Sequence, residues 1–291
     1  MTTHPDSPQR HPGLDPESRP PDHFSYPNGE VVFVGAGPGA ADLITLRGAR
    51  TIADADIVIW ASSLVDAQIV ANTKPGALVL DSASESLEDI TPLYQRAHDE
   101  GLLVARVHTG DPSIYGATAE QRRICERIGI PHRTIPGVSA FSAAAARMDA
   151  EITIPEVSQT LILTRLEGGR TPMPDRETVR GFAAHGVTMA LYLSAARNKV
   201  LQDELLAGGY PSDTPCIVGY KVSWPDELML RCRLDELSAT MKEHKLWKHT
   251  VVLVGPALAE QSTTRSHLYH PGFRHEYRAS DGTPLVTKES L

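Results

Sequence analysis

Three glycine-rich segments carry the residues of this chain that could do chemistry. They are Gly35-Ala36-Gly37-Pro38-Gly39, Thr109-Gly110-Asp111-Pro112-Ser113-Ile114-Tyr115-Gly116 and Pro136-Gly137-Val138-Ser139-Ala140. Each follows a short stretch of the strand type, and in a parallel sheet the loops at the carboxyl ends of the strands form the ligand crevice. Glycines let such loops turn sharply or lie close to a bound molecule. We therefore predict that the three segments converge on one binding site.

The first segment also fits the loose G-x-G-x-x-G/A pattern of dinucleotide-binding folds, through Gly35, Gly37 and Ala40. Two features argue against that interpretation. Pro38 lacks the backbone N–H that would hold a pyrophosphate. The next predicted strand runs into Ala61-Ser62-Ser63-Leu64, where a ribose-binding acid should stand. A nicotinamide-dependent oxidoreductase is the alternative enzyme class, and a binding protein without catalysis is a third interpretation.

Alternating strands and helices in the first half of the chain would position these segments. Strands are expected at 31–34, 57–60, 77–80, 103–108 and 132–135, and helices at 42–53 and 86–100. This alternation is typical of β-α units and a parallel sheet. Ser86 is the expected N-cap of the second helix, with Asp89 three residues later.

The second half, from about residue 151, predicts a mixed sheet. Strands are expected at 160–164, 189–193, 216–222, 228–233 and 250–254, and helices at 198–206 and 234–244. Pro225-Asp226 between two strand patterns predicts an antiparallel hairpin. The expected fold class is α/β, with a parallel N-terminal sheet and a mixed C-terminal sheet in two domains. We place the domains at 29–145 and 146–258, with a disordered extension over 1–28 and a polar tail over 259–291.

Composition excludes several classes of protein. The 291 residues carry a formal net charge of -8, which argues against a nucleic-acid partner. No run of 18 or more apolar residues is present, so we expect no membrane span. Cys125, Cys216 and Cys232 are odd in number and far apart, which indicates reduced thiols and a cytoplasmic protein without a structural zinc site.

The three segments together resemble the S-adenosylmethionine-dependent tetrapyrrole methyltransferases, over about residues 30–256. Later motifs are most similar to the branch that methylates precorrin-4 on the way to cobalamin. These motifs are Leu64-Val65, Asp81-Ser82-Ala83-Ser84, Pro155-Glu156-Val157-Ser158-Gln159-Thr160, Thr164-Arg165-Leu166-Glu167-Gly168 and Tyr220-Lys221-x-x-Trp224-Pro225-Asp226-Glu227. The resemblance implies methylation of precorrin-4 at C11, a cleft between the two α/β domains that holds both ligands, and commonly a homodimer. Precorrin-2 and uroporphyrinogen III are the nearest alternative substrates.

Matching motifs also imply the residues that touch the cofactor, S-adenosylmethionine. These are Pro38, Thr109, Gly110, Asp111, Ile114, Ser139 and Ala140, with Leu193 from the second domain. Asp111 is the candidate catalytic residue, because its carboxylate could offset positive charge on the cofactor; the alternative is that it only caps the turn at Pro112. Transfer to an electron-rich carbon depends mainly on positioning, so a general base is optional, and no residue of the sequence is marked as one.

The acetate and propionate groups of a tetrapyrrole call for arginine, lysine or backbone donors. The substrate-binding candidates beside the motifs are Arg106, Glu156, Gln159, Arg165, Glu167 and Lys221. The alternative for each cation is a surface or packing role. The acidic candidates have no histidine at a ligand spacing, so no metal site is expected. His108 is expected to be a hydrogen-bonded core histidine, with proton transfer as its alternative.

Overall fold

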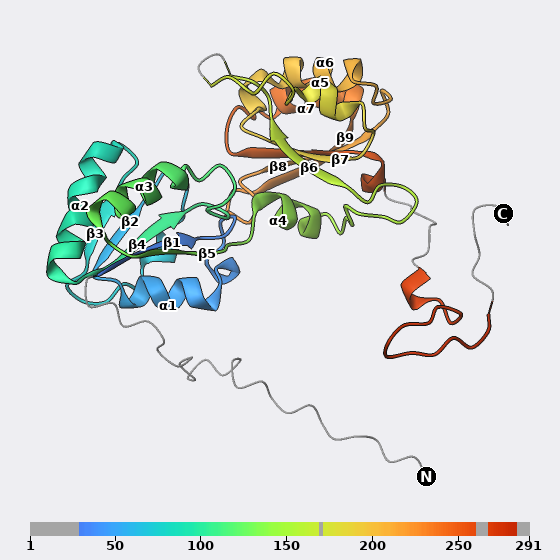
Figure 1. Cartoon of the computed structure of the whole chain (residues 1–291). Coiled ribbons are helices and arrows are strands. Elements are labelled where there is room, and N and C mark those ends of the chain that lie inside the picture. The colour runs from blue at the N-terminus through green and yellow to red at the C-terminus, as the bar shows by residue number, and fades with distance from the viewer. Residues whose placement is uncertain (1–28, 169–170, 260–266, 284–291) are drawn as a thin grey trace, which may run out of the picture.

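The computed structural model describes residues 29–168, 171–259 and 267–283. Within them the chain forms two five-stranded sheets, each covered by helices (Figure 1). The extension predicted over 1–28 lies outside the described residues. The predicted tail is described only at residue 259 and over 267–283.

The first sheet is wholly parallel, as predicted, with strand order β3-β2-β4-β1-β5. Its strands are β1 (Glu30–Gly35), β2 (Ile57–Trp60), β3 (Leu78–Asp81), β4 (Leu103–His108) and β5 (His132–Ile135). The strands β4, β1 and β5 are therefore neighbours, and the three glycine-rich segments follow them directly. This order brings segments about a hundred residues apart in sequence to one edge of the sheet.

Helices cover both faces of the first sheet, so Val31 to Val34 of β1 and Ile57 to Trp60 of β2 are apolar on both faces rather than alternating. Val32 and Val34 face a cluster that includes α1 (Leu46–Asp54), whereas Val31 and Phe33 face α2 (Leu87–Glu100) and α3 (Thr118–Ile128). Ser86 caps α2 in a capping box with Asp89, as predicted. The single helix predicted over 42–53 is wrong: the chain forms the 3-10 helix η2 (Ala41–Leu43) and then restarts, because Thr45 caps α1 by accepting from the Gly48 N–H at 3.1 Å.

The second sheet is mixed, as predicted, with strand order β6-β7-β10-β8-β9. Its strands are β6 (Leu161–Arg165), β7 (Thr188–Tyr192), β8 (Pro215–Tyr220), β9 (Leu228–Arg233) and β10 (Thr250–Val254). Only β6 and β7 pair in parallel, and the predicted hairpin is the β8–β9 pair. Three helices cover one face: α5 (Val179–Ala183), α6 (Asn198–Ala207) and α7 (Leu237–Glu243).

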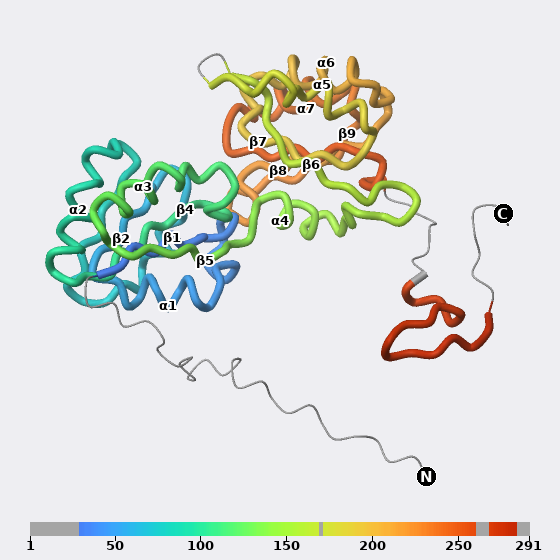
Figure 2. The backbone as a smooth tube through the Cα atoms, in the orientation of Figure 1, coloured from blue at the N-terminus to red at the C-terminus, as the bar shows by residue number. Residues whose placement is uncertain are grey.

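The opposite face of the second sheet packs on α4 (Ala140–Arg147), the helix that follows β5. Ala143, Ala144 and Ala145 of this helix share a cluster with Ile217 and Leu253 of the sheet. The backbone trace shows α4 running beneath that sheet, directly after the first domain ends (Figure 2). By its contacts α4 thus belongs to the second domain; the boundary at 145/146 stays a prediction.

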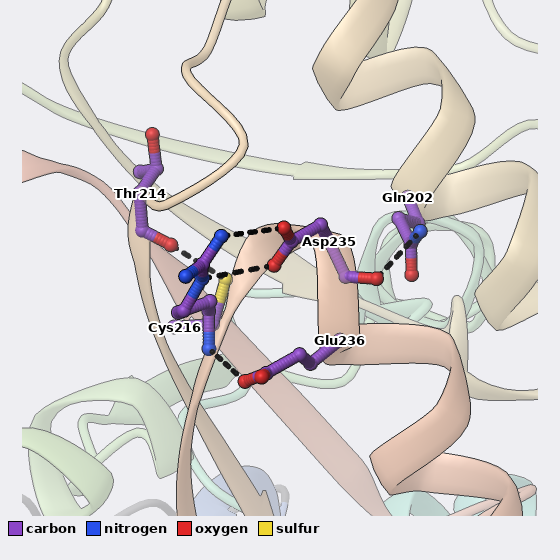
Figure 3. Close-up of polar contacts among 6 residues, drawn as sticks. Gln202, Thr214, Cys216, Asp235 and Glu236 are labelled. Atoms are coloured by element: carbon purple, nitrogen blue, oxygen red, sulfur yellow. Dashed lines mark hydrogen bonds and ion pairs between the residues drawn. The ribbon is translucent and has the colours of Figure 1, made fainter.

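Polar contacts fix the base of the β8–β9 hairpin to the helices behind it (Figure 3). Arg233 pairs with Asp235 at 2.7 Å, and its backbone N–H donates to Glu236 at 3.2 Å. Gln202 of α6 donates to the Asp235 carbonyl at 3.2 Å. With its base held this way, the hairpin can present its tip, residues 221–227, to the first domain.

Candidate functional site

The three glycine-rich segments meet, as predicted. The Gly110 N–H donates to the Gly37 carbonyl at 2.7 Å, and the Gly37 N–H donates back to Gly110 at 3.2 Å. A Cβ atom added at Gly137 would lie 2.0 Å from the Gly110 carbonyl oxygen and 2.8 Å from the Gly35 Cα. No side chain fits between these backbones, so this part of the site is built from main chain alone.

Asp111 ties two of the segments together. Its Oδ1 accepts from the Ser113 N–H at 2.8 Å and from the Ser113 hydroxyl at 2.5 Å, while its Oδ2 accepts from the Gly137 N–H at 2.9 Å. Partial burial raises the pKa of Asp111, but the hydrogen bonds from Ser113 and Gly137 outweigh it and leave the pKa below its usual value. The ionised carboxylate therefore caps its own turn, as one interpretation held, and also holds the Pro136–Ala140 segment. Contact with a cofactor stays a prediction.

A cavity of about 470 Å³ lies between the two domains, and we call it the interdomain cavity. The first domain contributes Pro38, Ser63, Leu64 and Thr109 to its wall, and α4 contributes Ala140. The second domain contributes the rest: Tyr192, Leu193, Ala195, Ala196, Gly219, Lys221, Val222, Trp224, Trp247, Lys248, His249, Thr250 and Val251. Of the cofactor residues implied by the resemblance, Pro38, Thr109, Ala140 and Leu193 thus line this cavity. Gly110, Asp111 and Ser139 lie in the loops beside it and are not part of its wall.

A second cavity, of about 290 Å³, adjoins the interdomain cavity at the end of β4. Leu64 and Thr109 line both, so the two cavities meet at these residues. Ile114, also implied as a cofactor contact, lines only the second cavity, together with Arg106, His108 and Tyr115. The arrangement offers two adjacent compartments that share one wall.

Strained backbone is concentrated around these cavities. Nine non-glycine residues of the described ranges have a positive φ, and five of them line one of the two cavities. The five are Tyr115, Ala117, Leu193, Lys221 and His249. Leu193 combines a φ of 51° with 73% exposure, an unfavourable state for a leucine. Such strain clusters where a site requires a particular backbone shape.

The tip of the β8–β9 hairpin forms hydrogen bonds and packing contacts with the first glycine-rich segment. The Trp224 Nε1–H donates to the Pro38 carbonyl at 3.1 Å, and the Ala40 N–H donates to the Ser223 hydroxyl at 2.9 Å. A Cβ atom on Gly39 would lie 2.3 Å from the Trp224 ring, so the indole packs directly against the segment. The second domain therefore fixes the first domain's loop at the cavity wall.

Tyr192 makes a second link between the domains. Its hydroxyl accepts from the Phe141 N–H at 2.9 Å and lies 2.7 Å from the Ser139 hydroxyl. It thereby satisfies a free N–H of the first turn of α4, which has no cap from its own Ser139. Sequence reasoning missed Tyr192, Trp224 and Trp247 as site residues. Trp224 stood in a quoted motif, but nothing in the local sequence marks the other two.

The structure brings two of the six substrate candidates into the cavity walls. Arg106 lines the second cavity, and Lys221 lines the interdomain cavity while pairing with Asp226 at 2.6 Å. Arg165 is near enough to Tyr115 to lower its pKa, although burial raises that pKa more, and it also holds the Thr171 and Pro172 carbonyls. Glu156, Gln159 and Glu167 are exposed and line neither cavity. Their binding roles stay predictions.

His108 departs from the expected hydrogen-bonded core histidine. The ring is largely buried and tilted against Phe33, with centroids 5.9 Å apart, but its Nε2 has no hydrogen-bond partner among the described residues. Burial, helped by the nearby Arg106 cation, lowers the pKa of His108 to about 3. A neutral imidazole of this kind is a weak proton acceptor, which disfavours the proton-transfer alternative as well.

Among the described residues, no other hollow, metal-ligand cluster or membrane-spanning helix offers an alternative to these two cavities as the candidate site. A hollow of about 900 Å³ on α2 and α3 includes none of the glycine-rich segments. Histidine, cysteine and carboxylate side chains form no group of three that could hold a metal in the described ranges. Over the same ranges, no helix has the length and apolar content to cross a bilayer.

The sequence matches a known family over nearly the whole of both domains. Residues 30–238 fit the model of the tetrapyrrole (corrin/porphyrin) methylases. The chain belongs to this family. The predicted resemblance is therefore confirmed, and it agrees with a site placed between two α/β domains.

Individual relatives of this chain are named for particular tetrapyrrole substrates. A cobalt-precorrin-4 C(11)-methyltransferase of Methanocaldococcus jannaschii is 43% identical over 87% of this chain and 97% of its own. The crystal structure of a cobalt precorrin-4 methyltransferase superimposes with a TM-score of 0.77 at 42% identity, covering 79% of this chain and 96% of the other. A uroporphyrin-III C-methyltransferase of Thermus thermophilus, solved with S-adenyl homocysteine, is 26% identical with a TM-score of 0.64, over 79% of this chain and 98% of that one.

Proposed function

We propose that this protein transfers a methyl group from S-adenosylmethionine to C11 of precorrin-4, giving precorrin-5 in cobalamin biosynthesis. The observation that carries the proposal is the pair of cavities that meet at Leu64 and Thr109. Methyl transfer needs two ligands in contact, and this site has a cavity of cofactor size with a second, smaller cavity directly beside it. The relative with 43% identity over 97% of its length supplies the expected substrate, by its name.

The interdomain cavity suits S-adenosylmethionine, which when bound supplies an electrophilic methyl group on a sulfonium. Its volume of about 470 Å³ lies in the ordinary range for small-molecule sites. Leu193, Val222 and Trp247 give apolar wall for an adenine, while the strand-end loops offer backbone groups for the polar ends. The solved relative with bound S-adenyl homocysteine, the demethylated form of this cofactor, supports this choice.

Catalysis by this site rests on positioning. The acceptor carbon must lie roughly 3 to 3.5 Å from the methyl and in line with the carbon–sulfur bond, and fixed walls supply much of that alignment. Asp111 holds the loop that carries Thr109, a residue of both cavities, and the Trp224 tip holds the Pro38 loop of the interdomain cavity. The new carbon–carbon bond forms as the carbon–sulfur bond breaks, and the ring then loses an N–H proton to solvent. No protein base is required.

Labelled product identifies both the reaction and the substrate. The protein is incubated with S-adenosylmethionine carrying a ¹³C-methyl group and either metal-free precorrin-4 or its cobalt complex, because two of the relatives above are named for the cobalt form. NMR should place the label at C11, and the faster arm shows which form is used. Label gained only with precorrin-2 or uroporphyrinogen III would move the protein to another branch of the family.

Ligand-induced stabilisation separates the proposal from a nicotinamide-dependent oxidoreductase. A ligand that binds only the native state raises the melting temperature. We expect S-adenosylhomocysteine to raise it and NADH to leave it unchanged. The opposite pattern would replace the methyltransferase assignment. A cytoplasmic homodimer completes the proposal, and sedimentation of the purified chain tests the dimer.

A further inference from the structure

Arg106 is a largely buried cation whose only partners are neutral. It stands on β4 between Phe33 of β1 and Ile59 of β2 in the strand register. Its Nη1 donates to the Ser82 hydroxyl at 2.8 Å and its Nε donates to the Gln121 side-chain oxygen at 3.1 Å. Among the described residues no carboxylate forms an ion pair with it. Burial accordingly lowers the pKa of Arg106.

The partners of Arg106 hold the guanidinium in one orientation. The Ser82 hydroxyl donates to the Trp60 carbonyl at 2.9 Å, and the Gln121 oxygen also accepts from the Tyr94 hydroxyl at 2.9 Å. A guanidinium has five N–H donors, and only those on Nε and Nη1 are used here. Nη2 has no partner in the described part of the chain and is not sealed from solvent. Because Arg106 lines the second cavity, this fixed cation is available to a ligand there.

A largely buried cation without a counter-ion lowers stability, and an anion bound at the open Nη2 would offset that cost. His108, whose buried Nε2 has no hydrogen-bond partner among the described residues, also lines this cavity. Glu85 and Glu120 also line the cavity, but both are exposed and neither forms an ion pair with Arg106. Arg106 is therefore the one arginine or lysine among the described residues that line this cavity.

We propose that the second cavity binds one carboxylate side arm of the macrocycle, with the Arg106 guanidinium as its counter-ion. This inference rests on the proposed function. A volume of about 290 Å³ is too small for the macrocycle and suits an acetate or propionate arm. Because Leu64 and Thr109 line both cavities, an arm held here places the ring edge beside the interdomain cavity. Arg106 is then a residue that sets which carbon faces the methyl group.

The test compares Arg106→Gln with Arg96→Gln, a matched change at an exposed arginine of α2 that pairs only with Glu100. Methyl transfer is measured at saturating S-adenosylmethionine with precorrin-4 varied. A charged hydrogen bond contributes about 1.5 to 3 kcal/mol, so we expect KM for the macrocycle to rise about tenfold to a hundredfold in Arg106→Gln. S-adenosylhomocysteine affinity should match wild type, and Arg96→Gln should change neither quantity.

Folding is checked separately, because a structural cation would also matter to the native state. Removing a buried cation without a counter-ion should leave the melting temperature of the ligand-free protein unchanged or higher. A folded Arg106→Gln with wild-type KM would overturn the proposal. So would equal weakening of macrocycle and S-adenosylhomocysteine, since that would indicate general loosening of the site.

A second probe keeps the inference separate from the proposed function. Uroporphyrin carries carboxylate arms, and its methyl ester does not. Wild type should bind uroporphyrin but not the ester in a fluorescence titration, and Arg106→Gln should lose that binding. If this pattern holds while precorrin-4 is not methylated, the carboxylate site stands and the proposed substrate fails. If wild type binds acid and ester equally, the carboxylate site fails, whatever the enzyme methylates.

Discussion

The two sides of the interdomain cavity are built in opposite ways. On the first domain, Gly35, Gly110 and Gly137 bring three backbones into contact behind the wall, and this contact positions the loops that carry Pro38 and Thr109. On the second domain, side chains such as Trp224 and Trp247 form the wall. The shape of the first side depends on glycines at the points where the loops touch. The shape of the second side depends on which side chains are present.

This difference shows where each side can vary. A backbone wall holds its shape only if the three loops keep their close approach, so it suits the part of a ligand that never changes. A side-chain wall can be reshaped by substitution without refolding the loops behind it. The strained Leu193, Lys221 and His249 all lie on the second side. This side therefore combines strained backbone with the side chains that can vary.

The largest expected effect is that of a substitution at Gly137, where the three loops of the first domain touch. In Gly137→Ala the new Cβ would meet the Gly110 carbonyl at 2.0 Å, and both atoms belong to rigid loops. We expect a loss of about 3 kcal/mol in the free energy of unfolding, the upper end for overpacking. Gly76→Ala is the control: its Cβ would meet nothing within 4 Å, and its positive φ of 83° costs about 1 kcal/mol. Urea denaturation measures the free energy of unfolding of both variants. Equal losses would show that the three loops can move apart to accommodate a side chain.

Trp224 tests the side-chain wall, with a smaller effect on stability and a direct effect on binding. Trp224→Phe loses the 3.1 Å hydrogen bond to Pro38 but keeps an aromatic ring against Gly39, whereas Trp224→Ala loses both. We expect S-adenosylhomocysteine affinity to fall about threefold in the first and about tenfold or more in the second, since a neutral hydrogen bond contributes about 0.5 to 1.5 kcal/mol. Calorimetric titration measures both.

Tyr277→Ala, at an aromatic residue that is 87% exposed, controls for removal of an aromatic side chain. Equal affinities for wild type and Trp224→Ala would show that the hairpin tip does not support the cofactor compartment.

The backbone side could be predicted from sequence, because its signals are local. Glycines directly after strand patterns mark loops that approach one another, and Ser86 with Asp89 marks a helix start. The resulting expectations of a parallel sheet and converging loops are confirmed. The β8–β9 hairpin was equally visible, since a Pro-Asp turn divides two strand patterns.

The side-chain wall was less predictable, because its contacts join residues far apart in sequence. Tyr192 caps a helix that begins 52 positions earlier, with its hydroxyl meeting the Phe141 N–H. Nothing near Tyr192 in the chain indicates that partner. The helix α4 was also missed, because its short alanine-rich sequence shows little polarity contrast between the side that the second sheet buries and the opposite side. Tertiary packing also sets the left-handed backbone of Leu193, which no propensity predicts.

A substitution at Asp111 has a small expected effect on the free energy of unfolding. The pH dependence of that effect tests whether the loops of the first domain depend on a charged side chain. Its pKa is lowered in the native state, so its stabilisation is present above the unfolded value of about 3.9 and is lost as pH falls through the native value. We expect Asp111→Asn to cost about 1 kcal/mol at pH 7, since one amide group cannot accept from both Ser113 and Gly137, and to cost less near pH 3. Asp42→Asn, at an exposed carboxylate of η2, is the control, measured by urea denaturation at both pH values. A difference from wild type that is independent of pH would mean that Asp111 acts through packing rather than charge. Loss of S-adenosylhomocysteine affinity with unchanged stability would instead assign the carboxylate to the cofactor, and so place one side chain in an otherwise backbone wall.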